Sequence, residues 1–107
     1  MELMTTEIAQ ALRDAPHDPP VEMAPIVVKY FNPCGAQTWF ISEGEEQHGN
    51  GQSDWELFGW CELGFGPGCS ELGYVMLSEL ESLTLPGGLG IERDLYYGPH
   101  MLSEVMD

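Results

Sequence analysis

The sequence has very few basic residues. Lys and Arg together number 3 among 107 residues, whereas Asp and Glu number 18, so the formal net charge is −15. The bases are Arg13, Lys29 and Arg93. A protein that binds nucleic acid or an anionic membrane uses Lys and Arg to contact phosphate groups. The composition therefore argues against direct binding of either, and it predicts a basic protein, or a cation, as the partner.

The sequence also lacks long apolar runs and export signals. No run approaches the roughly 18 apolar residues needed to span a bilayer. Residues 1–7 contain neither the basic start nor the apolar stretch of a secretory signal. Cys34, Cys61 and Cys69 are odd in number, and their spacing matches no zinc site. We therefore expect a cytoplasmic protein with reduced thiols.

Motifs for catalysis and for metal or cofactor binding are missing as well. The chain has no H-E-x-x-H pair, no EF-hand loop and no G-x-S-x-G nucleophile. No Lys follows the glycine-rich stretch 64–68, and Glu62 and Glu71 beside it would repel phosphate, so we interpret it as a turn. We expect no metal, no cofactor and no catalytic residue, and hence a protein that is not an enzyme.

The sequence does contain enough apolar surface for a folded domain. Hydrophobic residues make up 43% of it and aromatic residues 10%, which is too apolar for a disordered acidic chain. We predict a single acidic α+β domain over residues 1–107, with a small twisted antiparallel sheet of three or four strands and short helices covering one face of it. The expected strands are residues 26–31, 38–43, 55–63 and 71–76.

Two short helices are indicated by their capping residues. Thr5, or its neighbour Thr6, is suited to cap an N-terminal helix that ends at Asp14. Further along, Ser78 and Glu81 have the spacing of a capping box, in which a Ser side chain and a Glu side chain satisfy the first backbone N–H groups of a helix. The sequence therefore predicts a helix at each place.

Three motifs in the chain resemble a known family. They are V-V-K-Y-F-N-P with T-W in residues 27–39, F-G-W-C-E-L-G and E-L-G-Y-V-M-L-S-E-L-E in residues 58–81, and G-I-E-R-D-L-Y-Y in residues 90–97. Together they resemble domain of unknown function family 2958, whose members are small bacterial proteins of plasmids, integrative elements and phages, often encoded near antirestriction and conjugation genes. The family has no established catalytic residues. The resemblance therefore implies a mobile element in a host bacterial cell.

Six acids flank a predicted polar loop at residues 48–53. Residues i and i+2 of a strand lie about 6.7 Å apart on one face, close to the ~6.8 Å rise of two phosphate steps along a DNA strand. Alternation along the third predicted strand places Phe58 and Trp60 on the face of its acids, where they could anchor a Lys- or Arg-rich partner. A covering helix is the alternative. We expect the acids to share one surface, and the candidate partner-binding residues are Glu43, Glu45, Glu46, Asp54, Glu56, Trp60 and Glu62.

The charge favours mimicry of DNA as the leading hypothesis. A net charge of −15 corresponds to roughly 25 Å of duplex, similar to the span of a compact domain of this size. The protein would be a DNA-mimic inhibitor of a basic nucleic-acid-binding or nuclease complex of the host, of the anti-CRISPR or antirestriction type, carried by a phage or plasmid. The alternative is an accessory interaction module of plasmid or mobile-element maintenance, whose acidity serves solubility only.

The odd cysteine count generates a prediction about the thiols. Titration of the denatured protein with a chromogenic thiol reagent should detect three reactive groups per chain, because a reducing compartment leaves cysteines unpaired. The same titration after full reduction supplies the reference value. Detection of one group before reduction and three afterwards would mean that two of the cysteines form a disulfide.

Overall fold

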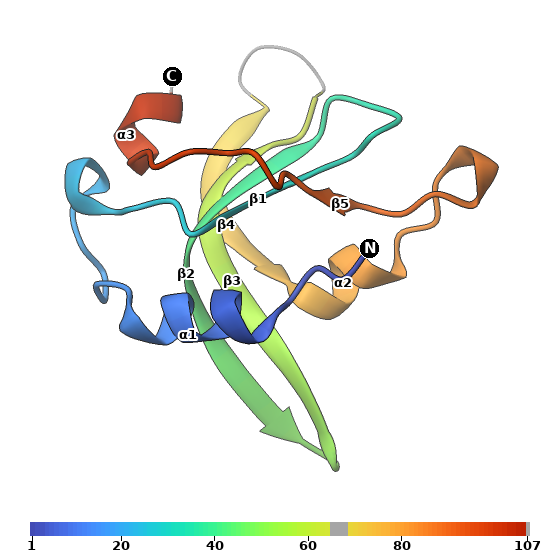
Figure 1. Cartoon of the computed structure of the whole chain (residues 1–107), viewed down its shortest axis with the longest axis horizontal. Helices are drawn as coiled ribbons and strands as arrows, with labels where there is room; N and C mark the ends of the chain where they lie inside the picture. Colours follow the sequence, from blue (N-terminus) through green and yellow to red (C-terminus); the bar gives the residue numbers. More distant parts are fainter. Residues whose placement is uncertain (65–68, 107) are drawn as a thin grey trace.

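The computed structural model describes residues 1–64 and 69–106, which form an α+β fold around one antiparallel sheet (Figure 1). The sheet has five strands in the order β4-β3-β2-β1-β5, so the predicted sheet is right in type but too small. Residues 65–68 of the turn predicted at 64–68 lie outside the described residues. The elements are α1 (Thr6–Asp14), η1 (Val21–Met23), β1 (Val28–Phe31), β2 (Thr38–Gly49), β3 (Gln52–Glu62), β4 (Ser70–Met76), α2 (Leu77–Ser82), η2 (Pro86–Gly88), β5 (Glu92–Arg93) and α3 (Leu102–Val105).

The hairpin of β2 and β3 is the longest feature of the sheet. Its tip extends beyond the other elements in Figure 1. The two strands pair up to Gly49 and Gln52, and only Asn50 and Gly51 connect them. Both have positive φ angles, 51° and 75°, as a two-residue type I′ turn requires. The predicted loop at 48–53 is therefore wrong in extent, because most of it continues the two strands.

A β-bulge interrupts this hairpin in its middle. Ile41 pairs with Gly59, and the next pair is Glu43 with Phe58, so Ser42 is an extra residue on β2. Gly59 is required at this place, because a Cβ atom there would lie 1.8 Å from the carbonyl oxygen of Phe40. Beyond the bulge, the side chains of β2 alternate in the opposite phase.

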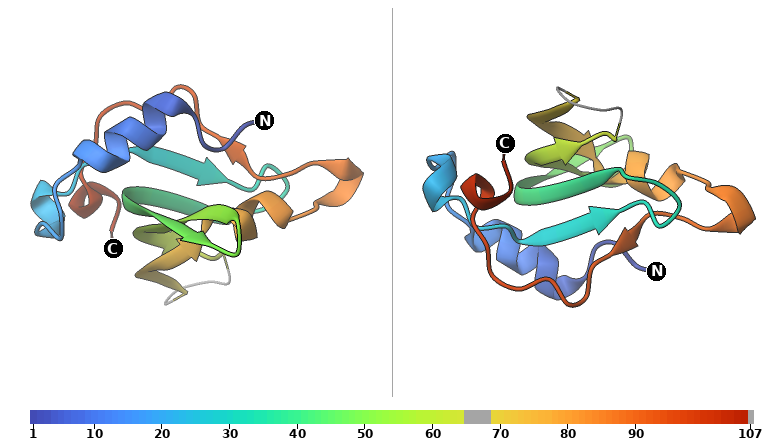
Figure 2. Two further views of the ribbon diagram at one scale, coloured as in Figure 1. Left: turned by 90° about the horizontal axis from the view of Figure 1, so that it is seen from below. Right: turned by 90° about the horizontal axis from the view of Figure 1, so that it is seen from above.

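The sheet buries apolar side chains on both of its faces. On one, the α1 face, Ile41 and Leu57 pack with residues of α1 and α2. On the other, the α3 face, Phe40 and Trp60 pack with Leu102 of α3. Figure 2 shows α1 along the outer side of the sheet, next to β1. The helices therefore cover both faces, whereas a single covered face was expected.

The first helix begins and ends as predicted. The Thr5 Oγ1 atom accepts a hydrogen bond of 3.1 Å from the backbone N–H of Ile8, and α1 ends at Asp14. The predicted cap of the second helix is wrong by two residues. Helix α2 begins at Leu77, and the Glu79 carboxylate accepts a hydrogen bond from the backbone N–H of Met76.

Two further expectations concern the cysteines and membrane-spanning segments. All three cysteines are free within the described chain: Cys34 is exposed, Cys61 is buried and Cys69 is half-buried. Burial raises the pKa of the Cys61 thiol to about 11, so this thiol is protonated at neutral pH. Across residues 1–64 and 69–106, no helix has the length and apolarity needed to cross a bilayer.

Truncation of Leu57 should destabilise the fold strongly. Its side chain is fully buried in the core of the α1 face, so Leu57→Ala should lower the free energy of unfolding by about 2–5 kcal/mol, the usual effect of removing a buried Leu. Leu72→Ala is the matched control, because Leu72 on β4 is partly exposed. Urea denaturation followed by tryptophan fluorescence measures both. Equal effects of the two substitutions would contradict this assignment of the core.

Candidate acidic interaction surface

The pairing register brings most of the predicted acids to one face of the sheet. Glu46 is the exception, since it pairs with Trp55 and lies on the α1 face. The bulge at Ser42 produces this arrangement, because without it the acids of β2 would alternate in the other phase. Five of the six predicted acids follow the α3 face, namely Glu43, Glu45, Asp54, Glu56 and Glu62.

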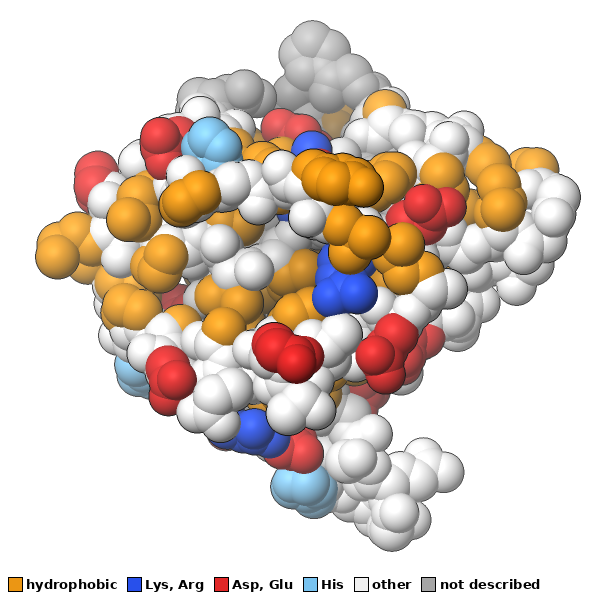
Figure 3. Space-filling view, in the orientation of Figure 1, with side chains coloured by type: hydrophobic (Ala, Val, Ile, Leu, Met, Phe, Trp, Pro, Cys, Tyr) orange, Lys and Arg blue, Asp and Glu red, His pale blue; other side chains and the backbone are white. Residues whose placement is uncertain are grey.

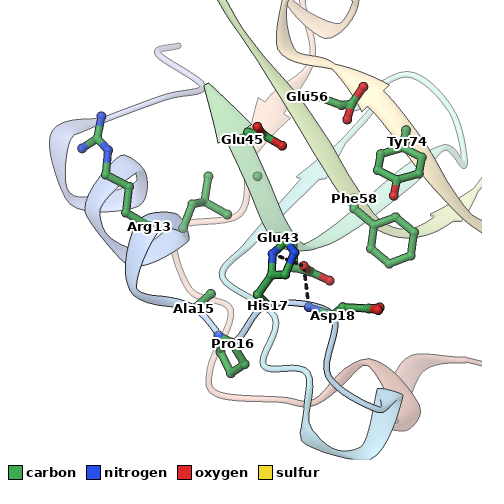
Figure 4. Close-up of a pocket in the computed structure, with 12 residues that line it drawn as sticks. Arg13, Ala15, Pro16, His17, Asp18, Glu43, Glu45, Glu56, Phe58 and Tyr74 are labelled. Carbon is green, nitrogen blue, oxygen red and sulfur yellow. Dashed lines mark hydrogen bonds and ion pairs between the residues drawn. The ribbon is translucent and has the colours of Figure 1, made fainter. Parts of the chain in front are cut away.

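Three of these acids line a groove, together with two aromatic rings. The groove has a volume of about 510 Å³. Its walls come from β2, β3 and β4, from Leu12 and Arg13 of α1, and from residues 15–18, which follow α1 (Figure 4). The acids and aromatic residues on the strand side of the groove are Glu43, Glu45, Glu56, Phe58 and Tyr74.

The carboxylates in the groove repel one another. Glu45 and Glu56 are directly opposite on β2 and β3, a position in which Cβ atoms are about 4.5–5.5 Å apart and like charges destabilise the sheet. Glu43 follows two residues away on the same face, about 6.7 Å from Glu45. A cation bound between such carboxylates would reduce this repulsion.

Within the described chain, no Lys or Arg neutralises these acids. Arg13 lines the groove, but its guanidinium lies 3.1 Å from Glu46 and stacks over the Trp55 ring at 5.5 Å. Figure 4 shows the Arg13 guanidinium pointing away from Glu43, whereas His17 lies beside it, with Nδ1 3.9 Å from the carboxylate. Glu43 accepts a hydrogen bond of 3.0 Å from the backbone N–H of Asp18. That contact fixes the carboxylate without removing its charge.

The aromatic pair gives the groove an apolar wall. The rings of Phe58 and Tyr74 lie 4.9 Å apart and are tilted by 54°, a favourable edge-to-face type of contact. The Tyr74 side chain is 69% exposed. An aromatic face beside carboxylates suits a Lys or Arg side chain, because the ring attracts the cation and the carboxylates pair with it.

Two other predicted acids lie on the same face but serve local contacts. The Asp54 carboxylate accepts hydrogen bonds from the backbone N–H of Ser78, at 3.0 Å, and from the Ser78 hydroxyl. It therefore holds the first turn of α2 against the hairpin. Glu62 accepts a hydrogen bond of 3.3 Å from the indole N–H of Trp60. It lies six residues from Glu56 on β3, or about 20 Å along the strand.

Trp60 is not available as a surface anchor. Its side chain is only 8% exposed and packs with Phe40 and Leu102. The alternative given above, that a helix covers this residue, is therefore right for Trp60. The prediction that Trp60 belongs to the partner-binding residues is wrong, because its side chain is buried. The C-terminal segment covers the sheet at Trp60 but leaves Phe58 half-exposed.

Charge is distributed unevenly across the sheet. Strands β2, β3 and β4 contain seven acids and no Lys or Arg. The bases of the sheet are Lys29 on β1, which pairs with Asp94 at 3.4 Å, and Arg93 on β5. Acids are not confined to the groove, since Figure 3 shows Asp and Glu side chains around much of the face in view. The groove is distinguished by their convergence beside aromatic rings.

Tyr74 and Asp18 belong to the groove but were absent from the predicted binding set. A signal for Tyr74 exists in the sequence, because Leu72, Tyr74 and Met76 alternate along a strand, and pairing that strand with β3 would have placed Tyr74 beside Phe58. Asp18 has a left-handed backbone with φ of 50°. It reaches Glu43 through a loop whose path no local pattern indicates.

The described residues contain no group of three His, Cys, Asp or Glu side chains arranged to hold a metal ion.

Residues 3–107 match the model of the family described as Protein of unknown function (DUF2958). The chain belongs to this family. The resemblance drawn from the three sequence motifs is thereby confirmed. No curated protein and no solved structure matches the DUF2958 chain.

The contact of Asp54 with α2 should make stability depend on pH. The hydrogen bond from the Ser78 hydroxyl lowers the pKa of Asp54 from its ordinary value of 3.8. The ionised form therefore stabilises the fold above that value, and this contribution disappears as the pH falls through the lowered pKa. Asp54→Asn should reduce the free energy of unfolding at pH 7 by about 0.5–1 kcal/mol, the low end for a helix cap because the group is exposed.

Urea denaturation of both proteins between pH 7 and pH 2.5 measures this difference, which should shrink in acid. Ser78→Ala serves as the second variant, because it removes the hydroxyl donor and leaves the carboxylate in place. A difference between the proteins that stays constant over the whole pH range would contradict the assignment.

Proposed function

We propose that this DUF2958 protein is a non-enzymatic, acidic inhibitor that binds a basic, nucleic-acid-binding protein of the host in place of DNA. A CRISPR effector or a restriction enzyme has the required chemistry, and a phage or plasmid is the natural carrier of such an inhibitor. The supporting observation is the convergence of Glu43, Glu45 and Glu56 in one groove, where no described Lys or Arg forms an ion pair with them.

The spacing and amount of charge agree with this proposal. Glu43 and Glu45 are two residues apart on one strand face, about 6.7 Å, and successive phosphates on one DNA strand rise by about 3.4 Å each. The molecule extends 40 × 38 × 25 Å and carries a net charge of −15, which equals the charge of roughly 25 Å of duplex. Sites that hold phosphates with Lys and Arg would meet carboxylates instead.

Long-range attraction would act mainly on the rate of association. Complementary charges accelerate the encounter of two proteins, and salt weakens this acceleration. The Debye length falls from about 10 Å at 0.1 M salt to about 3 Å at 1 M. An inhibitor of this type therefore binds rapidly at low salt and competes with nucleic acid for one surface.

The aromatic wall of the groove favours a second candidate function. Imitation of phosphates needs carboxylates only, whereas Phe58 and Tyr74 supply an apolar surface beside them. Such a surface suits a basic peptide segment in an accessory interaction module of plasmid or mobile-element maintenance. In that case nucleic acid does not compete with the partner.

Neutralising the groove should slow association with the host target. The variant Glu43→Gln, Glu45→Gln, Glu56→Gln keeps side-chain shape and removes three charges from the groove. We expect its association rate to fall at least tenfold at 0.1 M salt, with a smaller change in dissociation, because peripheral charges act mostly on association. Surface plasmon resonance on an immobilised restriction enzyme or CRISPR effector of the host, with duplex DNA as competitor, measures both rates.

The matched control is Glu2→Gln, Glu7→Gln, Glu92→Gln, which removes the same charge at sites outside the groove. This control should retain most of the association rate. Equal slowing by the two triple variants would mean that the groove acids act only through the net charge of the protein and not through their position. Binding that ignores both salt and competing DNA would contradict mimicry and favour the accessory module.

A further inference from the structure

Strand β4 presents an unpaired edge of the sheet. It is the outermost strand on its side and pairs with β3 alone, so no described strand bonds to its outer side. The side chains of Leu72 and Tyr74 are 38% and 69% exposed. They lie on the α3 face, where Tyr74 also forms part of the acidic groove.

The hydrogen-bond phase shows which backbone groups of β4 are free. The backbone N–H of Leu63 donates to the carbonyl oxygen of Cys69 at 3.3 Å. In an antiparallel pair, hydrogen-bonded and non-hydrogen-bonded positions alternate. The pairs Trp60–Leu72 and Phe58–Tyr74 are therefore non-hydrogen-bonded. The backbone N–H and C=O groups of Leu72 and Tyr74 point outward, away from β3.

This edge has few of the features that protect sheet edges in other proteins. Strand β4 has seven residues, S-E-L-G-Y-V-M, without Pro or Lys, and Glu71 is its one charged residue. An edge of this length with exposed apolar side chains is a template for pairing with another chain. Free backbone groups and exposed side chains therefore come from the same two residues, Leu72 and Tyr74.

Charge determines which chain can pair there. A second copy would bring another net charge of −15 into contact, and the repulsion opposes pairing. A basic segment is attracted, because β2 to β4 contain seven acids and no Lys or Arg. Glu56 and Glu62 lie one strand inward, opposite Met76 and Ser70 at the two ends of β4. Long Lys and Arg side chains from an added strand extend across β4 toward these carboxylates.

We infer that β4 is a docking edge on which an extended segment of the partner, bearing Lys or Arg, adds as a sixth strand. The backbone bonds of Leu72 and Tyr74 hold the segment, and the acids of β3 select its charge. This inference rests on the proposed function, since it names how the basic partner is held.

The probe for this inference is a capped nine-residue peptide of alternating Arg and Val. Amide hydrogen exchange followed by NMR should show fast exchange at Leu72 and Tyr74 in the free protein, with at least tenfold slowing when the peptide is bound. Leu72→Pro removes one outward N–H and should weaken binding at least tenfold. Leu72→Ala keeps that N–H and should weaken binding less. Thermal melting of each variant verifies that it is folded.

Each other outcome overturns the inference. Peptide binding without slower exchange at Leu72 and Tyr74 would place the peptide in the groove alone and leave the proposed function intact. Absence of peptide binding would exclude a basic segment as the occupant. Slow exchange at Leu72 and Tyr74 in the free protein that depends on protein concentration would identify a second copy as the occupant. Failure of the proposed function has a different signature, the salt-independent target binding described above.

Discussion

The bulge at Ser42 determines how this molecule uses its longest hairpin. Before it, β2 directs Trp39 and Ile41 into the core of the α1 face. After it, the inserted residue directs Glu43 and Glu45 to the opposite face. A regular strand would turn both carboxylates toward Leu12 of α1, since the position of Gly44 shows which side that helix occupies. One extra residue therefore allows a single strand to build the core and then an acidic surface.

The acidic surface exists because the α3 face is only partly covered. Helix α3 is one turn long and packs over Phe40 and Trp60. The sheet continues past it through Phe58 to Tyr74 on β4, where no described helix lies above the strands. The same face is therefore core at one end and a partly exposed acidic groove at the other. Aromatic residues occur in both parts, and coverage by the C-terminal segment decides which of them meet solvent.

Much of this arrangement follows from local patterns in the sequence. Alternation along β3 divides Trp55 and Leu57 from Glu56 and Phe58 correctly, because strand periodicity is independent of the rest of the fold. The hairpin turn at Asn50 also has a recognisable signal in the dipeptide Asn-Gly, whose chemistry favours a two-residue turn.

The remaining features depend on contacts between distant residues, which local patterns do not encode. Alternation alone separates Glu46 from Glu45, but the bulge has no composition of its own, so the sequence could not predict which of the two would share a face with the acids of β3. Burial of Trp60 depends on Leu102, 42 positions along the chain, and the contact of Asp54 with Ser78 crosses from the hairpin to α2. The six acids were identified from the sequence by their charge. Their assignment to the groove, to the contact with α2 or to the opposite face of the sheet required the pairing register of the strands.

The uneven charge of the sheet has a consequence for how the molecule travels toward a partner. Strands β1 and β5 contain Lys29, Arg93 and one acid, Glu92, whereas β2 to β4 contain seven acids and no Lys or Arg, so the negative charge of the sheet is concentrated on one side of its strand order. A positively charged surface would attract β2 to β4 more strongly than β1 and β5. The Debye length is about 8 Å at physiological salt, so this difference would act only within about the last nanometre of an approach.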